Sequence, residues 1–229
     1  GNYALGRGYR TLGDGTTALE HLQLAWNAGY RTADAAAALG LAHAEIFRVE
    51  SIRAQRIADD RQRAARIQEL EAAHRDRALD FLEEGRSSAI VPARYIEALI
   101  ASHRGDLQGA IEHADAAARE TPWLFEARLL PAHLEFTDSV RLYFMGNVRD
   151  AASKAREADR YYGQAQRIAA SAIDAYLGRC AVSGLVLHMA HHGLATAICA
   201  RAVGLRAKVA DIQDGVGCKR RRAHPCSEN

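Results

Sequence analysis

Small and apolar side chains recur along this chain at steps of three and four residues, the spacing that places side chains on one face of an α-helix. The segment that begins at Thr17 shows the pattern clearly, with one stripe made of Ala18, Leu22, Ala25 and Trp26. No stretch alternates apolar and polar residues with a period of two, and the chain has only 4 prolines. The pattern therefore predicts an all-α protein.

Glycines and prolines indicate where the helices end. The first helix is predicted over residues 2–12 and the second from Thr17 to Gly29. The later expectations are a helix from Ala33, turns at 105–107 and 146–148, a stop at Pro122, a long helix over 123–142, and another that runs on toward Ile173.

The same small residues return at fixed distances along the chain. Leu5-Gly6 recurs at a shift of 34 positions as Leu39-Gly40. A shift of 92 relates six positions of the first segment to Ala98, Ala101, Gly105, Ala110, Ala114 and Ala117, and a further shift of 41 leads to Gly146, Ala151, Ala155 and Ala158. Helices approach closely only where side chains are short, so this spacing predicts an α-solenoid of stacked antiparallel helix pairs.

The predicted repeat domain covers residues 1–212, with units at 1–31, 32–91, 92–122, 123–173 and 174–212, followed by a disordered basic tail at 213–229. The second unit is too long, because Ala78 and Leu82 come about 26 positions later than the repeat requires. The extra residues, 48–75, are rich in charged side chains. They could form a protruding antiparallel helix pair or one solvated helix within a loop.

The spacing L-G-x-x-Y, then G-D-x-x-x-A-x-x-x-L/A-x-x-A, then proline, resembles the tetratricopeptide repeat (TPR). The first copy is carried by Leu5, Gly6, Tyr9, Gly13, Asp14, Ala18, Leu22 and Ala25, and the third by Ala98, Ala101, Gly105, Asp106, Ala110, Ala114, Ala117 and Pro122. The resemblance implies a scaffold for protein–protein contacts.

A closer resemblance concerns the irregular units. The segments at 122–127 and 146–151, together with the charged insert, look like the C-terminal TPR region of certain bacterial serine/threonine protein kinases. That resemblance implies a docking or regulatory region whose catalytic domain would lie outside this sequence. A free-standing TPR adaptor is the alternative.

The charge content bears on the class of binding partner, and the cysteine content bears on the cellular compartment. Charged residues make up 25% of the 229 residues and the net charge is +2, which favours neither nucleic acid nor a membrane surface as the partner. We interpret the basic cluster at 219–222 as part of a solvated tail. The 4 cysteines contain no C-x-x-C pair, so we expect reduced thiols and a cytoplasmic protein.

One stretch, 180–200, lacks charged side chains over 21 residues and is long enough to span a bilayer. His188, His191 and His192 would then lie near the membrane centre, and Gly193 suggests a turn. A buried helical hairpin is the better interpretation.

Several motifs imitate catalytic or metal chemistry. His74-Arg75-Asp76 resembles a kinase catalytic loop, but Phe81 stands where that loop needs an Asn for magnesium. His188, His191 and His192, with Cys180 or Cys199, offer helical spacing for a metal but no H-E-x-x-H motif, which leaves a metal-dependent enzyme domain as a minor alternative. We expect no catalysis, no cofactor and no metal.

In a stacked array the first helix of each unit lines the inner, concave face. Repeat register places nine positions there, which predicts a peptide groove with an aromatic and apolar lining and a basic entrance: Tyr3, Arg7, Arg10, Tyr95, Leu99, Ser102, Phe136, Val140 and Tyr143. These positions do not fit the Lys- and Asn-based carboxylate clamp of some TPR proteins. The alternative is that the aromatic rings only fill space between helices.

Overall fold

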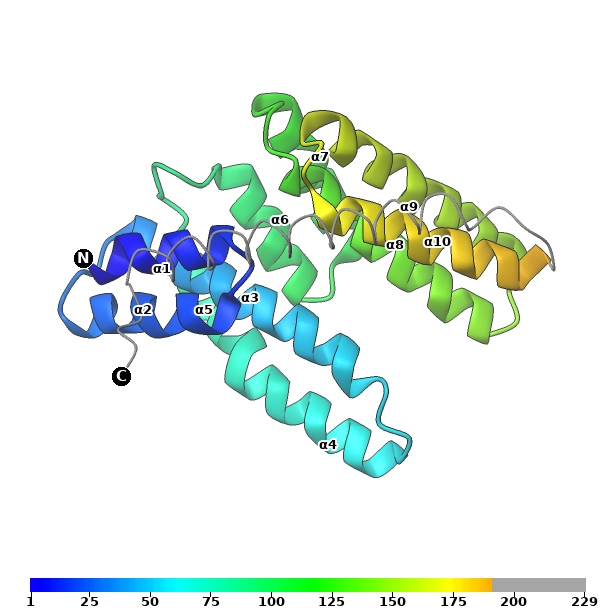
Figure 1. Ribbon diagram of the computed structural model, residues 1–229, viewed down its shortest axis with the longest axis horizontal. Helices are drawn as coiled ribbons and strands as arrows, with labels where there is room; N and C mark the ends of the chain where they lie inside the picture. Colours follow the sequence, from blue (N-terminus) through cyan, green and yellow to red (C-terminus); the bar gives the residue numbers. More distant parts are fainter. Residues whose placement is uncertain (191–229) are drawn as a thin grey trace, which may run out of the picture. The chain divides into compact units, whose positions relative to one another are not determined.

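The protein is described from a computed structural model, in which residues 1–190 are placed. Every regular element in that range is a helix, as the sequence pattern predicts. The elements are α1 Asn2–Thr11, α2 Gly15–Asn27, α3 Ala33–Ala54, α4 Asp60–Leu70, the π-helix η1 Glu71–Arg75, α5 Asp76–Glu84, α6 Ala93–His103, α7 Leu107–Glu120, α8 Glu126–Phe144, α9 Val148–Ile168 and α10 Ile173–Ala190 (Figure 1).

The chain divides into two compact units, Gly1–Thr121 and Pro122–Asn229. The division falls at Pro122, where the sequence places the end of the third repeat. In the second unit the described residues are 122–190.

In unit 1, α1 and α2 form an antiparallel pair whose turn is built by two residues. Gly13 adopts a φ of +77°, in the left-handed region that glycine enters without strain. Asp14 then caps α2 by accepting a hydrogen bond from the Thr17 backbone N–H at 3.1 Å. The buried side chains of α2 are the predicted stripe, namely Ala18, Leu22, Ala25 and Trp26.

The repeated Leu-Gly dipeptide marks two places where helices of unit 1 approach each other closely. A Cβ atom added to Gly6 would lie 2.6 Å from Leu22 Cγ, and one added to Gly40 would lie 2.7 Å from Leu82 Cγ. Such a separation is too short for van der Waals contact, so only glycine fits at either position. The recurrence of the dipeptide therefore has a packing cause.

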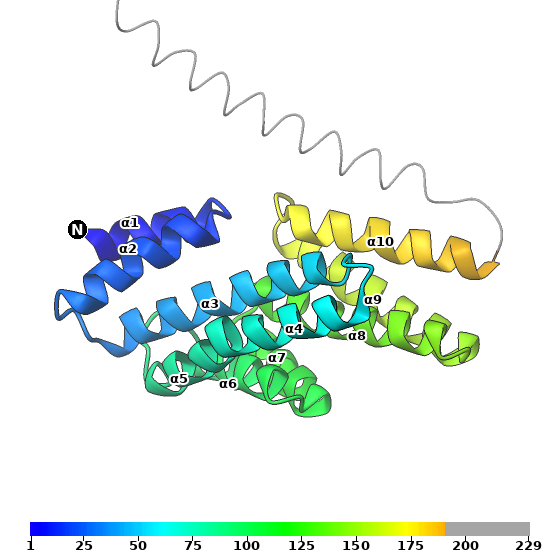
Figure 2. The same ribbon diagram turned by 90° about the horizontal axis from the view of Figure 1, so that it is seen from below.

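The charged insert forms two packed helices, one of the two arrangements that the sequence left open. The C-terminal part of α3 and all of α4 lie side by side and antiparallel (Figures 1 and 2). Between them, Glu50 of α3 and Arg66 of α4 form an ion pair at 3.6 Å. From α4 the chain continues through the π-helix into α5, which packs against α3.

The third pair of unit 1 consists of α6 and α7, which pack against each other. Gly105, with a φ of +82°, forms the turn, and Asp106 caps α7 through the Gly109 backbone N–H at 2.9 Å. This repeats the Gly-Asp turn of the first pair. Unit 1 is thus a succession of TPR-like helix pairs, α1 with α2, α3 with α5, and α6 with α7.

Over residues 122–190, unit 2 consists of α8, α9 and α10, with α9 packed against both other helices. Two predicted boundaries were wrong. The helix expected from Trp123 begins at Glu126, because residues 122–125 form a turn after Pro122. The helix expected to run toward Ile173 ends at Ile168, and the chain reverses over 169–172 so that α10 can return along α9.

The C-terminal part of the described chain bears on the predictions for the cysteines and for the 180–200 segment. Cys180 takes part in a disulfide, so the prediction of four reduced thiols was wrong; the other three cysteines lie outside the described residues. The second helix of the fifth unit, most of the 180–200 hairpin and the basic tail also lie outside them. Among residues 1–190, no helix combines the length and the apolar character needed to cross a bilayer.

Candidate functional site

The predicted inner-face residues of α1 lie together at the N-terminal end of unit 1. The Tyr3 ring is half-buried, and its centroid lies 4.9 Å from that of Tyr30. The Arg7 guanidinium stands 5.7 Å above the Tyr3 ring, in cation–π geometry, and is exposed, while Arg10 is half-buried. Burial and the neighbouring Asp34 raise the pKa of Tyr3, although the Arg7 charge opposes them. Tyr3 therefore has both a packing partner and a basic neighbour.

The other six predicted groove positions differ in how accessible they are. On α6, Tyr95 and Ser102 are half-buried, whereas Leu99 is only 7% exposed, which leaves little of it for a ligand. On α8 in unit 2, Phe136, Val140 and Tyr143 are all half-buried. The Tyr143 ring contacts Phe144 at 5.7 Å and His188 of α10 at 6.0 Å.

The kinase-like motif lies in helical structure. His74 and Arg75 belong to the π-helix and Asp76 begins α5, so the three residues form no loop. Phe81, the sixth residue of α5, packs edge-on against Trp26 with ring centroids 5.3 Å apart. The segment thus contributes to helix packing in unit 1.

A histidine pair that the sequence did not reveal lies between α3 and the π-helix. His43 Nδ1 and His74 Nδ1 are 3.1 Å apart, so one ring donates a hydrogen bond and the other accepts it. The His43 ring also stacks on Phe81 at 5.8 Å. Burial, with smaller contributions from the charges of His74 and Arg77, lowers the pKa of His43 to about 4. Burial also lowers the pKa of His74, so both rings are neutral at physiological pH.

A third histidine belongs to α6 and meets α3 at Phe47, one turn beyond His43 on that helix. His103 of α6 contacts the Phe47 ring at a centroid distance of 5.9 Å. Burial, together with the charge of Arg75, lowers the pKa of His103 to about 4. The i, i+4 spacing of His43 and Phe47 on α3 was the one signal in the sequence that could have indicated this stripe.

The metal-site alternative rests on residues that fall on both sides of residue 190. His188 contacts Tyr143, as described above, while His191, His192 and Cys199 lie outside the described residues. Within residues 1–190, no group of three or more His, Cys, Asp or Glu side chains is close enough to hold a metal ion.

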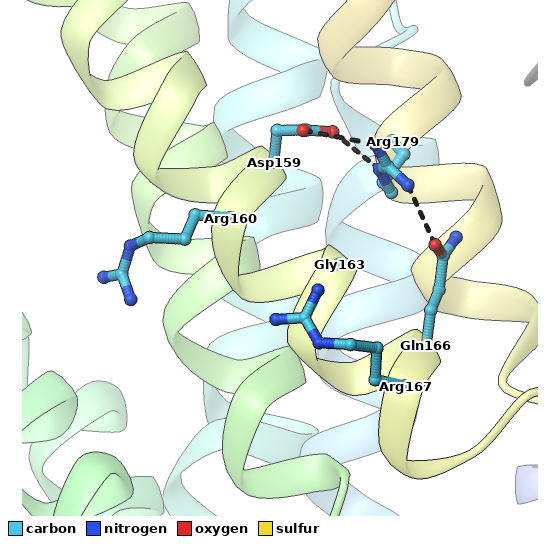
Figure 3. A pocket seen from close by; sticks show the side chains of 6 residues that line it. All are labelled: Asp159, Arg160, Gly163, Gln166, Arg167 and Arg179. Carbon is cyan, nitrogen blue, oxygen red and sulfur yellow. Dashed lines mark hydrogen bonds and ion pairs between the residues drawn. The ribbon is translucent and has the colours of Figure 1, made fainter.

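An open cavity of about 350 Å³ lies between α9 and α10 in unit 2 (Figure 3). Three of the six lining residues are arginines: the full set is Asp159, Arg160, Gly163, Gln166, Arg167 and Arg179. No motif in the sequence singles out any of them. Arg179 comes close to the α9 residues only because α10 packs on α9, and helical periodicity does not specify that packing.

Arg179 of α10 fixes one wall of this cavity. Its Nε donates to Asp159 Oδ1 at 2.7 Å and its Nη2 to Asp159 Oδ2 at 3.3 Å, the two-pronged geometry of an arginine–carboxylate pair. Its Nη1 also donates to Gln166 Oε1 at 2.9 Å. Figure 3 shows these contacts bridging the two helices.

The other two arginines come from α9. Arg160 forms an ion pair with Glu157 at 2.7 Å and lies 4.2 Å from the centroid of the Tyr161 ring. Burial lowers the pKa of Arg160, but hydrogen bonds to Glu157 and Tyr161 outweigh it and raise the pKa overall. Arg167 is exposed and has no hydrogen bond or ion pair with any other residue of the described chain. The cavity therefore presents two held guanidinium groups and one that is free to bind.

Comparison with known proteins gives no family assignment. No family model matches this sequence, and no curated protein matches it either. Among solved structures, the crystal structure of MamA is similar over 90% of this chain and 96% of its own, at 15% sequence identity and a TM-score of 0.41. At that identity and TM-score the likeness carries no functional inference.

Proposed function

We propose that this protein is a non-catalytic scaffold that binds protein or peptide partners. The observation that carries the proposal is the succession of TPR-like helix pairs in unit 1, two of which are closely packed at Gly6 and Gly40. Stacked pairs of this kind leave the faces of successive helices available to an extended ligand, and partner binding is what such arrays commonly do.

The proposed binding positions are the exposed and half-buried members of the predicted groove. In unit 1, Tyr3 with Arg7 on α1 and Tyr95 on α6 supply aromatic anchors and a basic group, and in unit 2 Tyr143 on α8 supplies a further aromatic anchor. Aromatic and arginine side chains dominate the affinity of protein interfaces. A peptide with apolar anchor residues is the ligand that these side chains would suit.

Exposed apolar side chains at the ends of α8 support an interaction role for unit 2. Phe144 is 81% exposed, Met145 is 69% exposed and Trp123 is 70% exposed. Phe144 and Met145 adjoin Tyr143 in the chain, and the Tyr143 ring touches Phe144. Large apolar side chains grouped at a surface are typical of partner-binding sites.

A selection experiment tests this proposal. A displayed library of random peptides would be panned against the immobilised whole chain, with a chain of scrambled sequence as the background. We expect enrichment of peptides that share apolar anchors at regular spacing. Their dissociation constants should lie in the micromolar range typical of short peptides, which corresponds to a binding free energy of about −8 kcal/mol. Enrichment no greater than the background would contradict the scaffold proposal.

The finer proposal is that the scaffold is the docking or regulatory region of a bacterial serine/threonine kinase. Its support is the sequence resemblance of the segments at 122–127 and 146–151 and of the insert at 48–75. A free-standing adaptor is the competing proposal. The genomic sequence upstream of Gly1 separates them, because a glycine-rich loop followed by an intact H-R-D-x-x-x-x-N motif would be present only in the first case.

The partner class and the compartment belong to the same proposal. A net charge of +2 with interspersed acids and bases supports a protein partner over nucleic acid or a membrane surface. The cytoplasmic location expected from reduced thiols loses that support, because Cys180 is disulfide-bonded.

A further inference from the structure

Two arginines and a glycine share one face of α9. Arg160, Gly163 and Arg167 follow one another at steps of three and four residues, so they lie along one side of the helix. A Cβ atom added to Gly163 would have Arg167 Nη1, 3.8 Å away, as its nearest neighbour beyond the local helix backbone. The space between the two arginines is open because Gly163 has no side chain to fill it (Figure 3).

The charges around this space do not balance. Arg179 is paired with Asp159, and Arg160 is paired with Glu157. Arg167 has no partner among the described residues. Two of the three guanidinium groups at the cavity are thus paired with a carboxylate, and within residues 1–190 the positive charge of Arg167 is left uncompensated.

The ligand that completes this arrangement carries one negative charge and two oxygen atoms. We propose that the α9–α10 cavity binds a carboxylate group, supplied by an aspartate or glutamate side chain of a partner peptide. A guanidinium group donates two parallel hydrogen bonds to a carboxylate, and Arg167 is free to do so. A phosphate group carries a charge of about −1.5 to −2 at neutral pH and would exceed the single charge available.

The two held arginines give the site its shape. Arg179 keeps a fixed position because three of its donor contacts go to Asp159 and Gln166. Arg160 is held by Glu157 and by the Tyr161 ring. An incoming carboxylate therefore orders only the Arg167 side chain, which limits the entropy lost on binding. A cavity of about 350 Å³ has room for an acidic side chain and part of its backbone.

This site differs from the predicted groove in place and in chemistry. The groove positions lie on α1, α6 and α8, whereas the cavity is formed by α9 and α10. The proposal that the carboxylate comes from a partner peptide rests on the proposed scaffold function, but carboxylate binding itself does not. The scaffold proposal and the carboxylate-binding proposal can therefore fail separately.

The experiment is a titration of the ¹⁵N-labelled whole chain, followed by the backbone amide signals of Gly163 and Arg167. The probe is N-acetyl-glutamic acid α-amide, which carries one carboxylate; the matched neutral control is N-acetyl-glutamine α-amide, and inorganic phosphate forms a third arm. All arms are run at equal ionic strength, because exposed charge pairs are screened by salt. We expect saturable shifts with the acetyl-glutamate probe alone.

Three variants localise the binding. Arg167→Gln removes the free charge and is expected to weaken binding by about fivefold or more. Arg156→Gln removes an exposed charge from the same helix, outside the cavity lining, and is expected to change the affinity less than twofold, as a rough estimate from screened charges. Gly163→Ala places a methyl group in the open space without a clash, so it is expected to weaken binding while leaving α9 as stable or more stable.

Each other outcome would overturn the proposal. Equal shifts with acetyl-glutamine would show that no charge is recognised. Binding of phosphate without binding of acetyl-glutamate would mean that the site takes another anion. Equal losses of affinity for the acetyl-glutamate probe in Arg167→Gln and Arg156→Gln would show that binding reflects only the general surface charge of α9. A failure here with successful peptide selection would leave the scaffold proposal standing.

Discussion

Gly178 of α10 lies directly against the ring of Tyr162 in α9. A Cβ atom added to Gly178 would be 2.2 Å from Tyr162 Cζ and 2.3 Å from Cε1. Tyr162 is itself only 1% exposed, so its ring has no free space into which it could move. The glycine sets how closely α10 packs on α9, and the arginine cavity lies in the same helix pair.

Gly178→Ala is therefore expected to destabilise unit 2 by about 1–3 kcal/mol, the usual cost of forcing an extra methyl group into a packed core. The matched control is Gly184→Ala on the same helix, where an added Cβ meets no atom within 4 Å. That variant should be neutral or stabilising by a few tenths of a kcal/mol, since alanine favours a helix. Urea denaturation followed by circular dichroism measures both; similar midpoints for the two variants would refute the packing account.

Gly40→Ala tests the repeated Leu-Gly contact in unit 1. The added methyl group would lie 2.7 Å from Leu82 Cγ and 3.0 Å from the Leu82 backbone nitrogen, which cannot move independently of α5. We expect a loss of about 1–3 kcal/mol in the free energy of unfolding. Gly8→Ala in α1, where the methyl group would meet nothing within 4 Å, is the control. Should Gly40→Ala unfold at the same denaturant concentration as wild type, the dipeptide has no packing role.

The His43–His74 pair predicts that unit 1 loses stability in mild acid. Because the pKa of His43 is lowered from 6.5 to about 4 in the folded state, the unfolded chain binds more protons between these values. Stability is fully present above pH 6.5 and is lost as the pH falls toward 4. The lowered pKa of His43 alone corresponds to about 2 kcal/mol between pH 7 and pH 5.

Denaturation curves at pH 7 and pH 5 test this, for wild type and for His43→Gln. The variant should show a smaller difference between the two pH values, whatever its stability at pH 7. His113→Gln changes a histidine of α7 that is not part of the His43–His74 pair. It should keep the wild-type difference in stability between pH 7 and pH 5. If His43→Gln retains the full pH dependence, His43 does not cause it.

The helices of this protein are predictable because their cause is local. The stripe of Ala18 and Leu22 lies on one face at helical spacing, and Gly13 with Asp14 forms the turn before it. The insert was ambiguous for the opposite reason: its mostly charged residues fit a solvated helix as well as a packed one. The sequence alone could not decide that Glu50 would face Arg66.

The sites depend on contacts between residues far apart in the chain. His43 and His74 are 31 positions apart and meet through the π-helix, which has no recognisable sequence signature. Arg179 and Asp159 are 20 positions apart and meet because α10 folds back along α9. Repeat register predicted the positions on α6 but not that Leu99 would be buried, because the register shows which face a residue takes and not how tightly its neighbours close over it.

The most direct test of the scaffold proposal is the affinity of a library-selected peptide for the variant Tyr95→Ala/Tyr143→Ala. The matched control, Tyr9→Ala/Phe125→Ala, also removes two half-buried aromatic rings, one from each unit, but leaves the predicted inner-face positions intact. We predict that the first variant binds at least about tenfold more weakly than wild type, a change of 1.4 kcal/mol, with unchanged helicity. The control should bind within about twofold of wild type. Unchanged affinity in the first variant, with its helices intact, would contradict binding along these helices.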